Sequence, residues 1–214
     1  MPNESRHRWR NSAARELLLA VSLAALVAAA AWQATPLAAP PEPRAWEDGV
    51  VRIYDTDELG RSVTTAAQRW NRSGADVRLI KVAKRENADV VFEVDNRALR
   101  EACGWDCLGY TSSIGKPSGG QVRVLLAAEL SGNPRPLSVW VAAHELGHVL
   151  GLMHRDGNAC SLMSAHAFDT SCAPSLAAEP PTLDQLACVP APADVEDAAA
   201  IYGGALTRRD ARCR

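Results

Sequence analysis

The sequence lacks a strong excess of charge of either sign. Its 214 residues include 23 Lys and Arg against 25 Asp and Glu, which gives a formal net charge of −2. Proteins that bind nucleic acid usually present a basic face or stripe. The near balance of charge therefore argues against a nucleic-acid partner. The chain also has no internal repeat, and its length suits one domain behind a short leader.

Hydrophobic runs long enough to span a bilayer are also missing. The longest run, residues 17–32, has 16 residues, whereas a spanning helix needs about 20. Four arginines precede this run and small residues end it, as in a secretory signal. We therefore expect residues 1–31 to be a signal peptide, or a membrane anchor if they are not cleaved.

The rest of the chain is expected to form a Pro-rich linker over residues 32–49 and one folded domain over residues 50–214. The basic flank of the hydrophobic run would stay in the cytoplasm. The domain would then be secreted, or anchored to the outer face of the membrane. Contact with the membrane is expected only if the N-terminal segment remains uncleaved.

Cysteine is sparse, and no C-x-x-C pair occurs among the six cysteines. Zinc sites built from cysteine usually need such pairs, so disulfides in an oxidising compartment are the favoured interpretation, with zinc ligation as the alternative. Sequence alone does not fix the pairing. We expect neighbours to join: Cys103 with Cys107, Cys160 with Cys172, and Cys188 with Cys213.

Histidine is scarce too, but three of the five histidines lie in one short segment. From His144 to His154 the chain reads HELGHVLGLMH, which is H-E-x-x-H-x-x-G-x-x-H. Residues four apart share one face of a helix, so His144 and His148 can bind one metal ion from the same side. Glu145 is turned about 100° away. Gly151 can adopt a positive φ and end the helix, which would let the chain return with His154.

Three nitrogen ligands and one open position are typical of a catalytic zinc site, whereas a structural site is closed by four protein ligands. We predict that His144, His148 and His154 bind zinc, and that Glu145 is the general base that activates a zinc-bound water. A chance H-E-x-x-H on a helix would not explain the longer pattern. Residues 156–158 offer oxygen ligands for calcium, although Asp-Gly-Asn is more typical of a turn.

The motif resembles the signature of the metzincin clan of zinc endopeptidases, in which a turn containing methionine follows the long histidine motif. Ser161-Leu162-Met163-Ser164 stands in that place. The resemblance implies an α+β, zincin-like fold, in which a twisted mixed sheet packs on the active-site helix and a C-terminal helix follows the Met-turn. It also implies that Met163 forms an apolar floor under the ligands.

Within this clan the chain is most similar to matrixin-type catalytic domains. The similarity implies that Asp194 braces the backbone of the Met-turn. It rests on four further segments: Val51–Tyr54, Arg69–Asn71, Ala88–Phe92 and Asp194–Gly203.

The chain also departs from the matrixin pattern. Arg155 follows the third histidine, where matrixins usually have a small serine. No tyrosine follows Met163 closely, so the tyrosine ligand of astacins and serralysins is not expected. The cysteines flanking the Met-turn are similar to those of snapalysin-type bacterial proteases, which use Asp as the third ligand. His166 could donate a hydrogen bond near the substrate, although a surface residue is the simpler interpretation.

Hydrophobic periodicity predicts the remaining elements. The zinc helix is expected to begin near Pro136, with Ser138 as a possible cap and Trp140 and Val141 on its buried side. By resemblance, residues 121–127 or nearby form the antiparallel edge strand that binds an extended peptide. Strands are predicted over 50–54, 77–83, 88–94 and 121–127, a helix over 57–72, and a loop over 98–120.

These expectations describe a secreted, monomeric zinc endopeptidase whose partner is a peptide or protein substrate bound in extended form. Two alternatives remain open at this point. One is an exported zinc-binding module with little turnover, which an intact Glu145 argues against. The other is a zinc amidohydrolase that acts on a non-protein amide.

Overall fold

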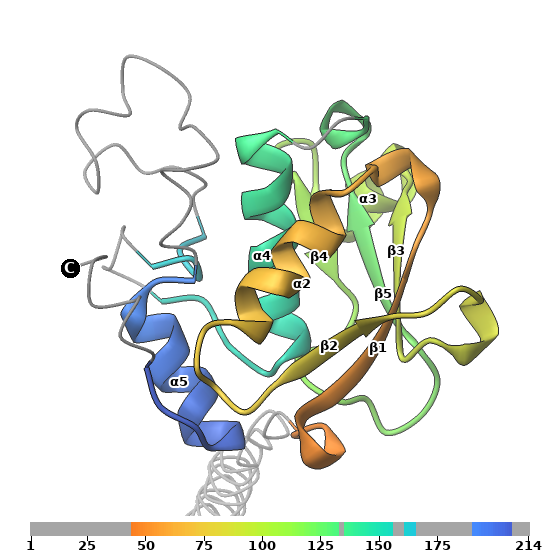
Figure 1. Cartoon of the computed structure of the whole chain (residues 1–214). Helices are drawn as coiled ribbons and strands as arrows, with labels where there is room; N and C mark the ends of the chain where they lie inside the picture. The colour runs from red at the N-terminus through yellow and green to blue at the C-terminus, as the bar shows by residue number, and fades with distance from the viewer. Residues whose placement is uncertain (1–43, 133–134, 156–160, 166–189, 207–214) are drawn as a thin grey trace, which may run out of the picture. The chain divides into compact units, whose positions relative to one another are not determined.

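The computed structural model describes residues 44–132, 135–155, 161–165 and 190–206 (Figure 1). These residues contain a five-stranded mixed sheet in the order β2-β1-β3-β5-β4. Four strands are parallel, and β4 is antiparallel to β5 at one edge. The strands are β1 (Val50–Asp55), β2 (Arg78–Lys81), β3 (Val90–Val94), β4 (Gly109–Thr111) and β5 (Val122–Leu126).

The helices lie on both faces of this sheet. A side chain at Gly109 would collide with helix α4, whereas the next residue, Tyr110, lines a pocket with residues of α3. Since side chains alternate along a strand, α3 and α4 cover opposite faces of β4. Helix α2 lies beside α4 (Figure 1). The helices are α2 (Ser62–Asn71), α3 (Asn96–Cys103), α4 (Pro136–Val149) and α5 (Pro192–Tyr202).

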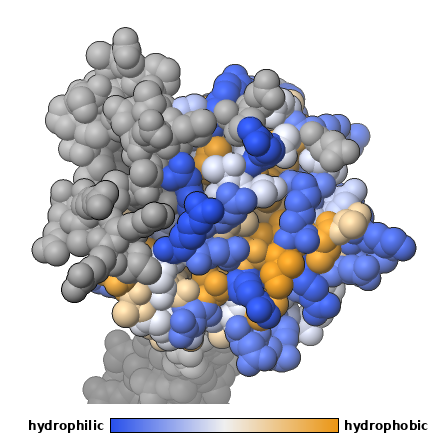
Figure 2. Space-filling model, viewed as in Figure 1, coloured by the Kyte–Doolittle hydropathy of each residue, from blue (hydrophilic) through white to orange (hydrophobic). Residues whose placement is uncertain are grey.

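The core lies between the sheet and the pair α2 and α4. Helix α2 turns one apolar face toward the core. Four apolar residues at helical spacing on this face are buried: Val63, Ala66, Ala67 and Trp70. Trp70 is fully buried, and its indole N–H donates to the Ala143 carbonyl of α4 at 2.9 Å. This bond satisfies the one polar group of the Trp70 side chain. Polar residues cover most of the coloured surface in Figure 2, with apolar ones between them.

The predicted α+β, zincin-like fold is confirmed, including the C-terminal helix after the Met-turn. Residues 44–49, at the end of the predicted linker, pack on the domain. Trp46 is 7% exposed, and its indole N–H donates to the Val149 carbonyl at 2.7 Å. Residues 1–43, which contain the predicted signal or anchor, lie outside the described part of the chain. Among the described residues, no helix combines the length and the apolar character needed to cross a membrane.

Three predictions about elements are wrong. The expected loop over 98–120 contains most of α3 and all of β4. Helix α3 is capped by Asp95, whose carboxylate accepts from two backbone N–H groups. It is only eight residues long and buries only Leu99, so it offers few apolar positions from which to predict a helix. The helix expected over 57–72 begins at Ser62, because a 3₁₀ turn and Gly60, at φ 55°, precede it.

The third correction concerns the edge strand. Strand β5, predicted over 121–127, lies between β3 and β4 and runs parallel to β3. The antiparallel edge strand is β4, paired through Gly109 with Leu126 and through Thr111 with Val124. A strand of three residues that begins with glycine offers almost no alternation to read, which explains why the sequence did not predict it.

Candidate metal centre

Helix α4 brings two of the three predicted zinc ligands together. Pro136 occupies its first turn, and the Ser138 hydroxyl accepts from the Arg135 N–H at 3.0 Å. Ser138 therefore stabilises the start of the helix from inside the first turn, and not as the N-cap residue. Every residue from Ser138 to Val149 is buried. His144 and His148 are 7% and 9% exposed.

The end of α4 returns the chain to the site. Gly151 has φ 98°, as its role in the motif predicts. Its N–H donates to the His148 carbonyl, and the Leu152 N–H donates to the Gly147 carbonyl, both at 2.9 Å. These bonds close the last turn of the helix in the way a left-handed glycine allows. His154 follows three residues later, and its side chain is on the exposed side of the cluster.

The three imidazoles converge on one point. Nε2 of His154 lies 3.2 Å from Nε2 of His144 and 3.1 Å from Nε2 of His148. The three candidate ligand atoms lie within 4.8 Å of one another. Four tetrahedral ligands at zinc–nitrogen bond length are separated by about 3.3 Å. The donor set and its spacing therefore fit a zinc ion held by His144, His148 and His154.

The other ring nitrogen of each helical histidine is held by the backbone. Nδ1 of His144 lies 2.7 Å from the Leu162 carbonyl, and Nδ1 of His148 lies 2.8 Å from the Leu152 carbonyl. A carbonyl oxygen only accepts, so Nδ1 carries the proton in both rings. The Nε2 lone pairs are then left for a metal, which is the usual arrangement of a ligating histidine.

Burial keeps both rings neutral. Together with the charge of the neighbouring imidazoles it lowers the pKa of His144 to about 3 and that of His148 to about 4, although the hydrogen bonds to the Leu162 and Leu152 carbonyls oppose these shifts. Because a metal binds only the neutral ring, both side chains stay competent to bind a metal well below pH 6.5.

The same shifts predict that the metal-free protein loses stability on acidification. The unfolded chain binds a proton at each of these histidines near pH 6.5, whereas the folded chain does so only at about pH 4 and about pH 3. In that window the unfolded state binds more protons, so the free energy of unfolding falls as the pH falls. Thermal unfolding at about pH 7 and about pH 5 would measure this slope.

Glu145 has the opposite effect on the slope of stability against pH, because its pKa is raised in the folded protein. The measurement therefore uses metal-free Glu145→Gln protein as the reference. Replacing His144 and His148 by Asn in that background should flatten the slope. An equal slope in the two proteins would show that these histidines are not neutral in the folded state.

The Met-turn lies directly beneath the helix that carries the ligands. Met163 is fully buried. A Cβ atom on Gly147 would lie only 2.3 Å from its sulfur. Gly147, between the two helical histidines, therefore leaves room for the Met163 side chain, which agrees with the expected apolar floor.

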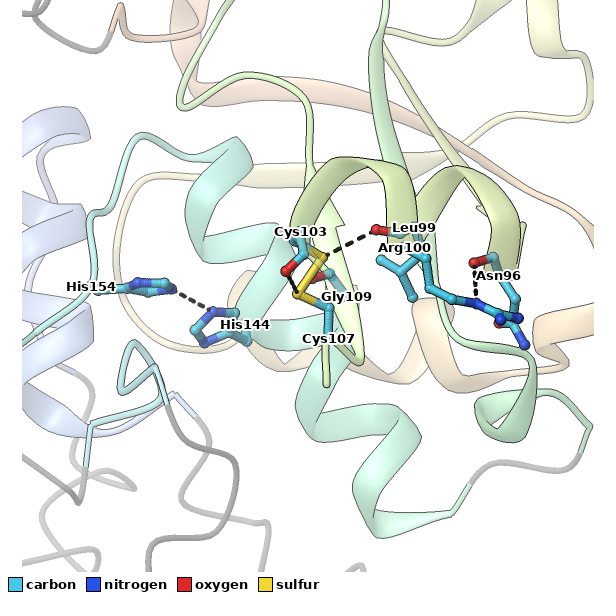
Figure 3. Close-up of a disulfide and its surroundings, with 8 residues drawn as sticks. All are labelled: Asn96, Leu99, Arg100, Cys103, Cys107, Gly109, His144 and His154. Carbon is cyan, nitrogen blue, oxygen red and sulfur yellow. Dashed lines mark hydrogen bonds between the residues drawn. A yellow bond between two sulfur atoms is a disulfide. The ribbon is translucent and has the colours of Figure 1, made fainter. Parts of the chain in front are cut away.

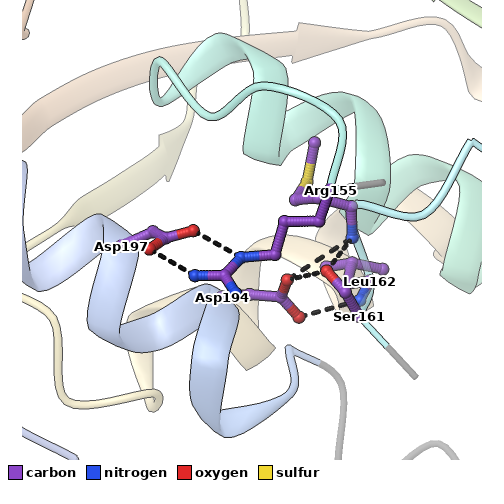
Figure 4. Close-up of polar contacts among 6 residues, drawn as sticks. Arg155, Ser161, Leu162, Asp194 and Asp197 are labelled. Carbon is purple, nitrogen blue, oxygen red and sulfur yellow. Dashed lines mark hydrogen bonds and ion pairs between the residues drawn. The ribbon is translucent and has the colours of Figure 1, made fainter. Parts of the chain in front are cut away.

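Asp194 at the start of α5 holds the Met-turn in place (Figure 4). Its buried carboxylate accepts from the N–H groups of Leu162 and Met163 at 2.8 and 3.4 Å, and from the Ser161 hydroxyl. Burial raises the pKa of Asp194, and the hydrogen bonds oppose this shift. Since the Leu162 carbonyl accepts from His144, Asp194 orients this predicted zinc ligand through one residue. The structure thus brings Asp194 to the place that the resemblance implies.

Arg155 fastens the loop after the third histidine to the same helix. The Arg155 guanidinium makes a bidentate pair with Asp197, at 2.6 and 2.8 Å. The backbone N–H of Arg155 donates to the Met163 carbonyl at 2.9 Å. The sequence marked Arg155 as a departure from matrixins but gave no sign of its partner.

Glu145 is buried beside the cluster. It is 4% exposed, and burial raises its pKa to about 7. The Thr111 hydroxyl donates to its Oε2 at 2.6 Å, which opposes this rise. Sequence reasoning missed Thr111, because it lies in a Gly- and Ser-rich segment that was expected to be a loop.

Comparison with known families gives an independent result. The model of metallo-peptidase family M12B, reprolysin-like, matches residues 49–155. The chain belongs to the reprolysin-like metallopeptidases. The match spans β1 to Arg155 and contains the three histidines and Glu145. No curated protein matches the chain.

The family result supports a metzincin-type zinc peptidase, while the closer resemblance to matrixins stays a prediction. In this metallopeptidase the disulfide Cys103–Cys107 is present, as predicted, with the two Cα atoms 6.1 Å apart. It joins the end of α3 to the segment that leads into β4 at Gly109 (Figure 3). His166, residues 156–158 and the other two expected cysteine pairs lie outside the described residues.

Proposed function

We propose that this reprolysin-like metallopeptidase is a secreted zinc endopeptidase that cleaves extended peptide segments of proteins. The observation that carries the proposal is the convergence of three histidine Nε2 atoms beside a buried glutamate. When bound there, zinc supplies a Lewis acid that polarises the scissile carbonyl and makes water a better nucleophile. The Cys103–Cys107 disulfide supports export, because such bonds persist in oxidising compartments.

The side chains of the site have separate tasks. His144, His148 and His154 would hold the zinc ion, and the place of the ion determines where the scissile bond must lie. Glu145 takes a proton from the attacking water and returns it to the leaving amine. Its raised pKa of about 7 in the metal-free protein suits a group that must both accept and release a proton near neutral pH.

Substrate alignment is assigned to the outer edge of β4. In the described part of the chain β4 pairs only with β5, so its other edge is not used by the sheet. An extended peptide can add to such an edge by backbone hydrogen bonds. The strand lies against α4 at Glu145, so a peptide on it would pass close to the ligand cluster.

Purified full-length protein tests this function. We expect hydrolysis of an unfolded protein substrate, loss of hydrolysis on chelation, and recovery when zinc is added back. Mass spectrometry of the products should show internal cleavage. Release of terminal residues alone would contradict an endopeptidase. Cleavage of N-acyl amides but not of peptides would favour the amidohydrolase, and bound zinc without turnover would favour a binding module.

The N-terminal sequence of the protein recovered outside the cell tests the predicted leader. A mature chain that begins after about residue 31 would support cleavage and secretion. An intact N-terminus in the membrane fraction would support the anchor instead. Recovery only from the cytoplasm would contradict both.

A further inference from the structure

The edge strand β4 touches the catalytic glutamate as well as the sheet. Gly109 and Thr111 stand on the face of β4 that meets α4, and Tyr110 stands on the other face. The strand itself is held by its ladder of hydrogen bonds with β5. Ser112, the residue after the strand, extends this pairing, because its backbone N–H donates to the Arg123 carbonyl at 2.9 Å. Thr111 is therefore presented to α4 from a fixed backbone.

Gly109 allows the close approach between the strand and the helix. A Cβ atom at this position would lie 2.4 Å from Oε1 of Glu145 and 2.9 Å from a methyl group of Val141. Any side chain there would displace one of them. The carboxylate of Glu145 consequently lies directly against the β4 backbone, where solvent reaches little of it.

Thr111 is the side chain that makes a hydrogen bond to this carboxylate. Its hydroxyl lies 2.6 Å from Oε2 of Glu145. Among the described residues, no other side chain donates to that carboxylate. A short bond to an ionised acceptor is the stronger kind of hydrogen bond. Its loss would leave a buried carboxylate with several rotamers in place of one.

We propose that Thr111 is a positioning residue, whose hydroxyl fixes the Glu145 carboxylate in the orientation needed for proton transfer. The inference rests on the proposed peptidase function and adds a residue outside the zinc motif. One strand would then perform two tasks, since β4 is also the strand assigned to the substrate. Misplacement of a catalytic group by about 1 Å can lower a rate about a hundredfold.

The test compares Thr111→Val, which has the same shape but no hydroxyl, with Thr111→Ser, which restores the hydroxyl. In the zinc-loaded enzyme Thr111→Val should lower kcat about tenfold to a hundredfold and leave KM nearly unchanged. Thr111→Ser should recover most of kcat. Ser113→Ala is the matched control, because its hydroxyl lies 3.5 Å from the Gly115 carbonyl and does not touch Glu145.

A second measurement reads the contact without turnover. In isotope-labelled, metal-free protein, the side-chain carboxyl carbon of Glu145 should shift in Thr111→Val and return toward the wild-type position in Thr111→Ser. A wild-type kcat in Thr111→Val would overturn the inference, and so would equal losses in the Val and Ser variants. An unshifted carboxyl signal would show that the contact is absent. An inactive wild-type enzyme with this contact intact would instead count against the proposed function.

Discussion

Replacing Glu145 by Gln is expected to lower kcat about 100-fold to 10,000-fold, the usual contribution of a general acid–base group. Glutamine keeps the shape of the side chain and can still accept from the Thr111 hydroxyl. It cannot take a proton from water at neutral pH. Because Glu145 is not one of the three predicted zinc ligands, the variant should bind zinc as the wild type does. Steady-state kinetics and zinc content measure the two effects separately.

The same substitution should not cost stability. The pKa of Glu145 is raised from 4.5 to about 7 by burial. In the metal-free protein the folded state therefore binds the proton more tightly than the unfolded chain does. That stabilisation declines as the pH rises from about 4.5 through 7. At about pH 8 the glutamine variant should be at least as stable as the wild type. A glutamate retained at a cost in stability is typical of a functional residue.

Glu86→Gln is the matched control for Glu145→Gln, since that side chain is 70% exposed. It should leave kcat and stability unchanged. A Glu145→Gln enzyme with wild-type kcat would show that another group transfers the proton, and the proposed mechanism would be wrong.

Replacing Asp194 by Ala is expected to lower the free energy of unfolding by about 3–5 kcal/mol, because several buried donors would lose their acceptor. The N–H groups of Leu162, Met163 and Ala191 and the Ser161 hydroxyl all donate to this carboxylate. Released from Asp194, the Met-turn would no longer hold the Leu162 carbonyl against His144. Loss of such support usually lowers metal affinity about tenfold to a hundredfold.

Urea unfolding of the metal-free protein and competition for zinc with a chelator measure these two effects. Asp194→Asn keeps one acceptor oxygen, so it should lose less unfolding free energy and less zinc affinity than Asp194→Ala. Asp197→Asn on the same helix is the control, because its partly exposed pair with Arg155 should contribute no more than about 1 kcal/mol. An Asp194→Ala protein with wild-type stability and zinc affinity would show that the Met-turn keeps its conformation without the hydrogen bonds to Asp194.

The metal site could be predicted because its geometry is local. His144 and His148 share a helix, and Gly151 turns the chain so that His154 returns. Eleven consecutive residues, 144–154, contain all three histidines and Gly151. The longer strands and the body of α2, although not its start, were also predictable, since their apolar residues repeat over several turns or alternations.

Thr111 and Asp197 could not be predicted in this way. Each acts through a partner more than thirty residues distant in the chain. Thr111 also lies in a strand of three residues, and the helix before it, α3, buries only Leu99. Elements this short are determined by the neighbours on which they pack, and their own sequence carries little signal. Asp194 was found only because the resemblance to a known family supplied its role.

The bond from Asp194 to the Met-turn has a consequence for the order in which the enzyme becomes active. Asp194 lies forty residues after His154, so a nascent chain on the ribosome exposes all three histidines before it contains α5. Until that last helix docks, the Leu162 carbonyl lacks its brace and His144 lacks a fixed ring orientation. The ring of His144 therefore reaches its final orientation only after α5 has been made and has docked against the Met-turn.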